Sequence, residues 1–206
     1  MTEDHWNVLV ADFNNSLLRS HLEETKTDRS ELFLDNNKNI TALDPVVIFR
    51  ELTHLDAHQT TVHDLAPLGE LARRAPLLRD LNLSNTLISD LQPLRGFVSL
   101  QFLNISHCIN VEHLEPISGM SNLQFLHIDG TRISCLESVP LVSLRYLNAA
   151  HTRVYDLSPL ANSRISDLSL MGCKRIPPSG FSVLCSLNLS ELSLSETSLT
   201  SRYLET

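Results

Sequence analysis

Three histidines and one aspartate in the second half of the chain could supply metal ligands. His107, His127 and His151 carry imidazole nitrogens and Asp129 carries a carboxylate, which are ligand types of zinc sites. The same groups could instead make polar contacts with a partner, which would change as pH falls through the titration range of histidine. The choice depends on how the fold brings together residues that lie far apart in the chain.

Three aromatic residues in the same region could form a recognition surface. Phe102, Phe125 and Tyr146 follow one another at intervals of 23 and 21 residues, and Asn104 and Asn148 lie close by. Aromatic side chains beside hydrogen-bonding groups are typical of a protein-binding hot spot. The alternative is that the rings only cover one another on a sheet.

The motifs of enzymatic catalysis are missing from the sequence. It has no glycine-rich phosphate loop, no nucleophile elbow and no H-E-x-x-H, and its 6 glycines are scattered. Ser182 and Cys185 have no general base at a suggestive spacing. We therefore expect a protein without enzymatic activity, cofactor or small-molecule substrate.

The aromatic residues belong to a repeat that runs through most of the chain. With Leu78 of "LRDLNLSNT" counted as position 0, apolar residues recur at positions 3, 5, 10, 13 and 16, and position 8 holds Thr, Cys or Asn. The spacings between eight such repeats are 23, 26, 22, 23, 21, 21 and 24 residues. The repeats begin at Arg29, Leu52, Leu78, Leu100, Leu123, Leu144, Ile165 and Leu189.

The pattern "LxxLxLxxT-x-I-x-D-L-x-P-L" resembles the leucine-rich repeat family, in particular its short-repeat subclass, which includes bacterial internalins and phosphatase-regulatory proteins. The resemblance covers residues 29–199 and implies an α/β solenoid, with a curved parallel β-sheet on the concave side and short 3₁₀ or turn segments on the convex side. That subclass usually has Asn at position 8. Here Thr or Cys follows in every repeat after Asn37, so we expect hydroxyls and thiols to form the inward hydrogen bonds.

Residue patterning supports the same architecture. The alternation "x-L-x-L-x" directs two leucines inward, as a short strand requires. The stretches "HDLAPL", "SDLQPL" and "YDLSPL" place Asp where it can cap a turn and Pro where no N–H is needed, which predicts short 3₁₀ turns.

The repeat frame predicts which side chains face solvent on the concave sheet. Since parallel strands lie about 4.8 Å apart, Phe102, Phe125 and Tyr146 at position 2 should form one stripe. We expect this surface to bind a partner protein. A metal site is disfavoured, because the candidate ligands lie on three strands at differing positions and open sheets seldom give tetrahedral geometry. The predicted partner-binding residues are Phe102, Phe125, Tyr146, Asn104, His107, His127, Asp129, Asn148 and His151.

The two ends of a solenoid need to cover apolar surface. Residues 1–28 are predicted to form an N-terminal helical cap on a repeat domain that spans 29–206; Trp6 could instead anchor a partner. At the C-terminus, Leu199, Tyr203 and Leu204 either fold back as a minimal cap or leave the edge to another chain or to a continuation of this chain. An edge covered by another chain would suit a structural subunit built permanently into a large assembly through its N-terminal helix and its open C-terminal edge.

Composition limits the classes of partner. The chain has 206 residues, 24 acidic and 16 basic, without a basic run, which argues against nucleic acid or anionic lipid. The start "MTEDHWNVLVADFNNS" does not resemble a secretory signal, and no stretch approaches the roughly 18 apolar residues of a membrane span, so we expect an intracellular, most simply cytoplasmic, protein. The four cysteines form no C-x-x-C pair and are expected to be buried free thiols.

Overall fold

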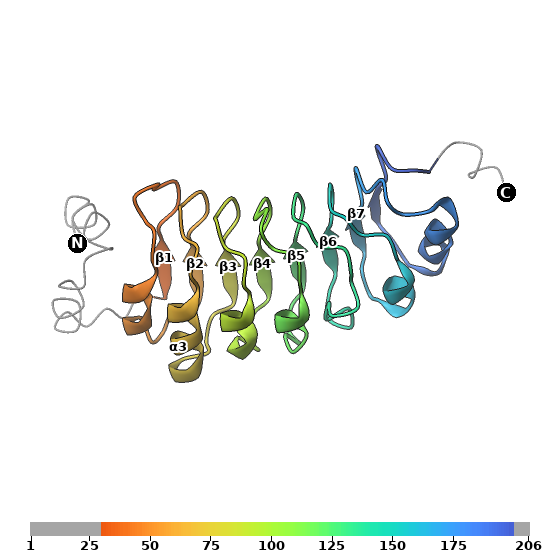
Figure 1. The fold of residues 1–206 in the computed structure, drawn as a ribbon. Helices are drawn as coiled ribbons and strands as arrows, with labels where there is room; N and C mark the ends of the chain where they lie inside the picture. Colours follow the sequence, from red (N-terminus) through yellow and green to blue (C-terminus); the bar gives the residue numbers. More distant parts are fainter. Residues whose placement is uncertain (1–29, 200–206) are drawn as a thin grey trace.

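The computed structural model describes residues 30–199, which form a gently curved row of stacked repeats (Figure 1). The predicted helical cap of residues 1–28 lies outside the described residues, as do Tyr203 and Leu204. Within the described range, no helix is long and apolar enough to cross a membrane.

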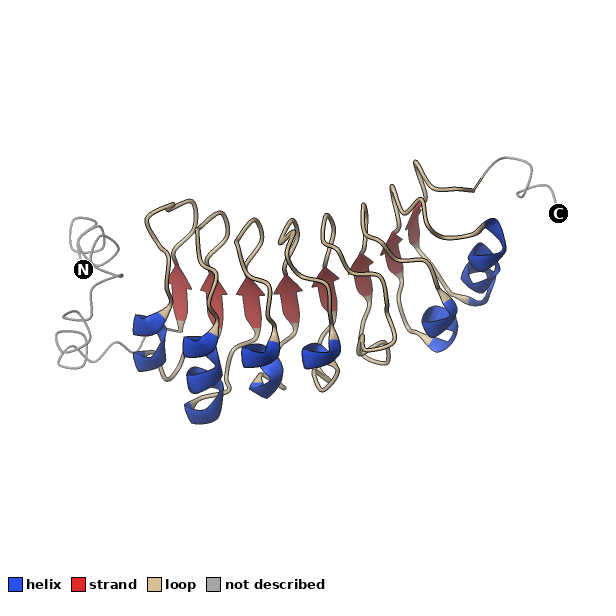
Figure 2. Cartoon of the chain, viewed as in Figure 1, coloured by secondary structure: helices blue, strands red, loops and turns tan. Residues whose placement is uncertain are grey.

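Eight strands of three residues each form one parallel sheet in sequential order (Figure 2). Each strand covers positions 2–4 of a repeat, and position 2 pairs with position 2 of the next strand along the whole sheet, as the repeat frame predicts. The strands are β1 (Glu31–Phe33), β2 (His54–Asp56), β3 (Asp80–Asn82), β4 (Phe102–Asn104), β5 (Phe125–His127), β6 (Tyr146–Asn148), β7 (Asp167–Ser169) and β8 (Glu191–Ser193). The predicted solenoid is confirmed.

The core lies between this sheet and the outer arms of the repeats. The middle residue of every strand is Leu, and from Leu32 to Leu168 this residue is at most 3% exposed. In half of the repeats, buried apolar residues at positions 5, 10 and 13 complete the layer, and in the repeats that begin at Arg29 and Leu100 the last two are displaced by one residue. Because each layer is covered by its neighbours, the stack buries a continuous core that one repeat could not form alone.

The outer arms carry short 3₁₀ helices, each with Pro at its first or second position. The carboxylates of Asp90 and Asp156 accept the backbone N–H two residues later, at 2.8 Å in both cases, so the predicted Asp caps are present. The 3₁₀ helices are η1 (Asp44–Ile48), η2 (Gln92–Gly96), η3 (Glu115–Ile117), η4 (Ser158–Asn162) and η5 (Pro178–Ser186).

The prediction of a short turn is wrong for "HDLAPL". Here the chain forms a nine-residue α-helix, α3 (Ala66–Arg74), which buries Leu68, Leu71 and Ala72. The repeat that begins at Leu52 is the longest, with 26 residues before the next one, and the additional residues extend the turn into a helix whose apolar face has a core to cover.

Side-chain hydrogen bonds at position 8 stabilise the turn after each strand. The Thr131 hydroxyl donates to the carbonyl of Ile128 at 2.6 Å, and Thr60, Thr86, Thr152 and Thr197 repeat this bond three residues back. The thiols of Cys108 and Cys173 reach instead to a carbonyl of the preceding repeat, at 3.1 Å in both cases. The predicted ladder of hydroxyls and thiols is therefore confirmed.

The cysteines only partly follow the sequence expectation. All four are unpaired, but Cys135 and Cys185 are exposed, so the prediction of buried thiols is wrong for these two. Burial raises the pKa of the Cys108 thiol, an effect that a hydrogen bond with Thr86 opposes. Cys108 and Cys173 act as small core residues.

Candidate functional site

The concave sheet presents three aromatic side chains in one row. Phe102, Phe125 and Tyr146 begin β4, β5 and β6 and are direct partners in the strand register. The rings of Phe125 and Tyr146 are 6.4 Å apart between centroids, and Phe125 is 42% exposed. We call Phe102, Phe125 and Tyr146 the aromatic stripe.

A fourth ring joins the aromatic stripe. His127 follows Phe125 by two residues on β5, and its imidazole lies 5.4 Å from Phe102 and 4.7 Å from Tyr146 between centroids. Burial lowers the pKa of His127, and the negative charge of Asp129 partly opposes this effect. The neutral imidazole is therefore favoured, and it behaves as part of the aromatic surface.

Asp129 connects several polar groups beside the stripe. Its Oδ1 accepts hydrogen bonds from the Ser106 hydroxyl at 2.5 Å and from Asn148 Nδ2 at 2.9 Å. Its Oδ2 lies 3.4 Å from Nε2 of His107. With these partners and only 18% of its side chain exposed, Asp129 mainly orders the residues around it.

The two predicted asparagines are used largely within the fold. Oδ1 of Asn104 accepts the backbone N–H of Ser106 at 2.9 Å, and Oδ1 of Asn148 accepts that of Ala150 at 3.1 Å. These bonds close the turn at the end of each strand. The amide nitrogen of Asn104 has no partner within the described part of the chain and is free for an outside acceptor, whereas that of Asn148 already donates to Asp129.

His107 and His151 lie beyond the strands, in left-handed turns with φ of 58° and 55°. Each ring occupies the space above a glycine of the next repeat, because a Cβ on Gly130 or Gly172 would lie 2.3 Å from the Nδ1 of that histidine. Sequence reasoning missed this packing. Its signal is His at position 7 of one repeat followed by Gly at position 7 of the next.

The four candidate metal ligands do not form one site. Asp129 is near His107 and His127, whereas His151 packs over Gly172 in the following repeat. Among residues 30–199, no group of three or more His, Cys, Asp and Glu is arranged to hold a metal ion.

Acidic residues border the aromatic stripe at both ends of its row. Asp80 pairs in register with Phe102, and Asp167 with Tyr146. The pKa of Tyr146 is raised, first by burial and then by the charges of Asp129, Asp167 and Glu191. The Tyr146 phenol is therefore in a region of negative potential.

Several solved structures share this architecture. The chain matches internalin C2 of Listeria monocytogenes with a TM-score of 0.74 and 25% identity, over 86% of this chain and 76% of that one. It also matches an internalin, InlF, of the same organism, with a TM-score of 0.75 and 17% identity, over 94% of this chain and 59% of that one. A leucine-rich repeat protein of Leptospira interrogans follows, with a TM-score of 0.55 and 18% identity, over 82% of this chain and 49% of that one.

The chain is a leucine-rich repeat protein. No protein-family model matches its sequence, and no curated protein matches it. The repeat architecture therefore identifies the family.

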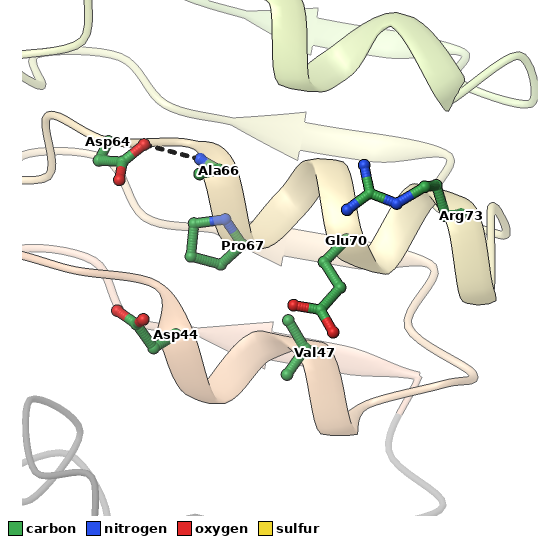
Figure 3. Close-up of a pocket in the computed structure, with 7 residues that line it drawn as sticks. All are labelled: Asp44, Val47, Asp64, Ala66, Pro67, Glu70 and Arg73. Carbon is green, nitrogen blue, oxygen red and sulfur yellow. Dashed lines mark hydrogen bonds between the residues drawn. The ribbon is translucent and has the colours of Figure 1, made fainter.

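This leucine-rich repeat protein has a second concave feature, on its outer side. A cleft of about 300 Å³ lies between η1 and α3, with Asp44, Asp64, Glu70 and Arg73 among its lining residues (Figure 3). Asp64 caps the first turn of α3 by accepting the Ala66 N–H at 2.8 Å, and Glu70 pairs with Arg74 at 2.6 Å. These carboxylates serve the helix itself, and we assign the cleft no function.

Proposed function

We propose that this leucine-rich repeat protein binds another protein through its concave face, centred on the aromatic stripe. The observation that carries this proposal is the exposure of Phe125, which remains 42% exposed although aromatic rings lie on both sides of it. Rings that only covered one another would leave less apolar surface in water. Covering this surface would release the water around it, which favours association.

The composition around the stripe also supports recognition. Aromatic residues carry a large share of the binding energy in protein interfaces, and hydrogen-bonding groups at the rim give specificity. Here the amide nitrogen of Asn104 and the exposed rings of His107 and His151 lie beside the stripe. His127, Asp129 and Asn148 contribute by fixing the geometry of the surface.

One arrangement on the sheet resembles a catalytic relay, but we propose that it is structural. The Thr53 hydroxyl lies 2.8 Å from Nδ1 of His54, whose Nε2 lies 2.8 Å from Asp80. The same hydroxyl donates to the carbonyl of Ser30 at 3.0 Å, so its proton already has an acceptor in the neighbouring repeat. We therefore assign this arrangement a role in joining neighbouring repeats.

We also propose that the protein works inside the cell, most simply in the cytoplasm. All four cysteines are unpaired, and two of them are exposed. Exposed unpaired thiols persist in reducing compartments, whereas oxidising ones favour disulfides.

The experiment that tests the binding proposal is affinity capture from extracts of the source cells, with quantitative mass spectrometry. The immobilised full chain is compared with the variant Phe102→Ala/Phe125→Ala/Tyr146→Ala. The matched control is Val98→Ala/Val142→Ala/Tyr155→Ala, which truncates three exposed apolar side chains that lie off the strands.

We expect a partner that the wild type and the control retain and that the stripe variant loses. Equal recovery by all three folded proteins would refute the proposal.

A second candidate function is that of a structural subunit whose sheet is continued by another chain. The observation in its favour is Leu192 of β8, which is 44% exposed, whereas its counterpart Leu168 in β7 is 3% exposed. Leu199, by contrast, is partly buried against the core, as a minimal cap would require. Sedimentation of the isolated chain discriminates: a stable monomer with a cooperative unfolding transition argues against this role, and self-association that Leu192→Ser abolishes supports it.

A further inference from the structure

We propose that the partner presents an arginine side chain to the aromatic stripe, with the guanidinium group stacked on the exposed rings. This inference rests on the proposed function, because it concerns the chemistry of the ligand at the same surface. It follows from the charges that surround the stripe on the concave face.

The solvent-facing rows of the sheet are acidic. Positions 2 and 4 lie on the strands, and the ladder of backbone hydrogen bonds continues past them, as in the bond from the His107 N–H to the Asp129 carbonyl at 2.7 Å. Positions 2, 4 and 6 of the eight repeats contain no Lys or Arg. Their carboxylates are Glu31, Asp35, Asp56, Asp80, Asp129, Asp167 and Glu191.

Besides Asp129, two carboxylates stand at the ends of the stripe. Asp80 and Asp167 stand one strand beyond Phe102 and Tyr146, about 4.8 Å away along the hydrogen-bonding direction. A planar cation that lies over Phe125 would be two strands, or roughly 9.6 Å, from the strand that carries each of these carboxylates, close enough for their negative charge to attract it. Oδ2 of Asp80 also lies 2.8 Å from Nε2 of His54. The pKa of Tyr146 is raised first by burial and then by the negative charges of Asp129, Asp167 and Glu191.

Guanidinium has the physical properties that this surface selects. It stacks on aromatic faces through cation–π attraction and presents several N–H donors to carboxylates in its own plane. A carboxylate ligand would be repelled, and an apolar ligand would gain no attraction from the negative charges of the acidic residues. Arg79 and Arg145, at position 1 of their repeats, lie immediately before β3 and β6, outside positions 2, 4 and 6.

The test is an NMR titration of the isotope-labelled chain with three capped eight-residue peptides. They share one glycine and serine framework and carry two arginines, two citrullines or two glutamates. Citrulline keeps the shape of arginine without its charge. We expect the arginine peptide to shift the ring resonances of the stripe and the amide resonances of β4–β6, and to bind about tenfold more tightly than the citrulline peptide.

A charge variant and its control locate the effect. Asp80→Asn/Asp167→Asn should weaken binding of the arginine peptide by about fivefold. Glu115→Gln/Glu137→Gln removes two exposed charges from the outer side and should stay within about twofold of the wild type. If the first variant unfolds, salt dependence in the wild type replaces it, since added salt should weaken binding of the arginine peptide and spare the citrulline peptide.

Equal affinity for arginine and citrulline, shifts away from β4–β6, or no shift at millimolar arginine peptide would overturn the inference. Such a result combined with loss of a captured partner by the stripe variant would leave the proposed function intact. Failure of the capture experiment as well would remove both.

Discussion

The two faces of the same eight strands follow different rules. On the core-facing side of the sheet, the middle residue is Leu in every strand, and it is buried in β1 to β7. On the solvent-facing concave side, the first residue changes from one strand to the next. It runs from Glu31 and His54 through Asp80 to the aromatic stripe and then to Asp167 and Glu191.

This difference separates stability from recognition. A layer of the core accepts one kind of side chain, because neighbouring layers have the same shape and fill space closely. The solvent-facing side has no such constraint, so each repeat can place a different side chain there without disturbing the stack. Function is expected where the residues of the solvent-facing side become aromatic while the core-facing leucines stay the same, which is at β4–β6.

The largest effect on stability should follow from a change on the core-facing side of the sheet. Leu126→Ala removes a fully buried side chain and should lower the free energy of unfolding by about 2–5 kcal/mol. The adjacent change Phe125→Ala, on the solvent-facing side of the sheet, should cost less than about 1 kcal/mol, since Phe125 is 42% exposed. Urea unfolding measures both. Similar losses for the two variants would mean that the stripe contributes to the core.

The turn beyond the strands provides a second comparison. Gly130 has φ of +68°, and a Cβ there would collide with the ring of His107, so Gly130→Ala should lower the free energy of unfolding by about 1–3 kcal/mol. In a His107→Ala background the same substitution should cost less, because only the backbone strain remains. Equal costs in the two backgrounds would show that the ring does not occupy this space.

A smaller effect is expected from the inward ladder. Thr131→Val removes the only side-chain donor to the carbonyl of Ile128 among the described residues and should cost about 1 kcal/mol. Thr86→Val should cost less, because the Leu83 carbonyl keeps the hydrogen bond from the Cys108 thiol. Chemical unfolding would contradict this account of the ladder if Thr86→Val were the more damaging change.

The smallest effect concerns pH and His127. The pKa of His127 in the folded protein is lowered, so its contribution to stability is present above the unfolded pKa of about 6.5 and is lost as pH falls below it. His127→Asn places there the residue that β4 and β6 carry at this position. The loss of stability between pH 7.5 and pH 5.5 should be greater in the wild type than in this variant. A greater loss in the variant would contradict the assigned direction of the shift.

The sequence predicts the register of the sheet and the position of the aromatic stripe, because both depend only on the repeat frame. The exposure of Cys135 was also contained in that frame, since this residue occupies position 12, where Asp90 and Asp156 cap a turn. It was missed because the expectation for cysteines came from their residue type.

Other features depend on local backbone conformation and on neighbouring repeats. Two such features are the hydrogen bond from the Ser106 N–H to Oδ1 of Asn104 and the packing of His107 over Gly130. Neither can be predicted unless the left-handed turn after the strand is known. The extension of "HDLAPL" into α3 depends on the space that adjacent outer arms leave, which one repeat does not encode.

The most direct test of the separation between stability and recognition is to measure affinity and stability in one variant. Phe102→Ala/Phe125→Ala/Tyr146→Ala should bind the captured partner about 100-fold more weakly by calorimetry. Its free energy of unfolding should fall by less than that of Leu126→Ala. Unchanged affinity in this folded variant would contradict the central claim.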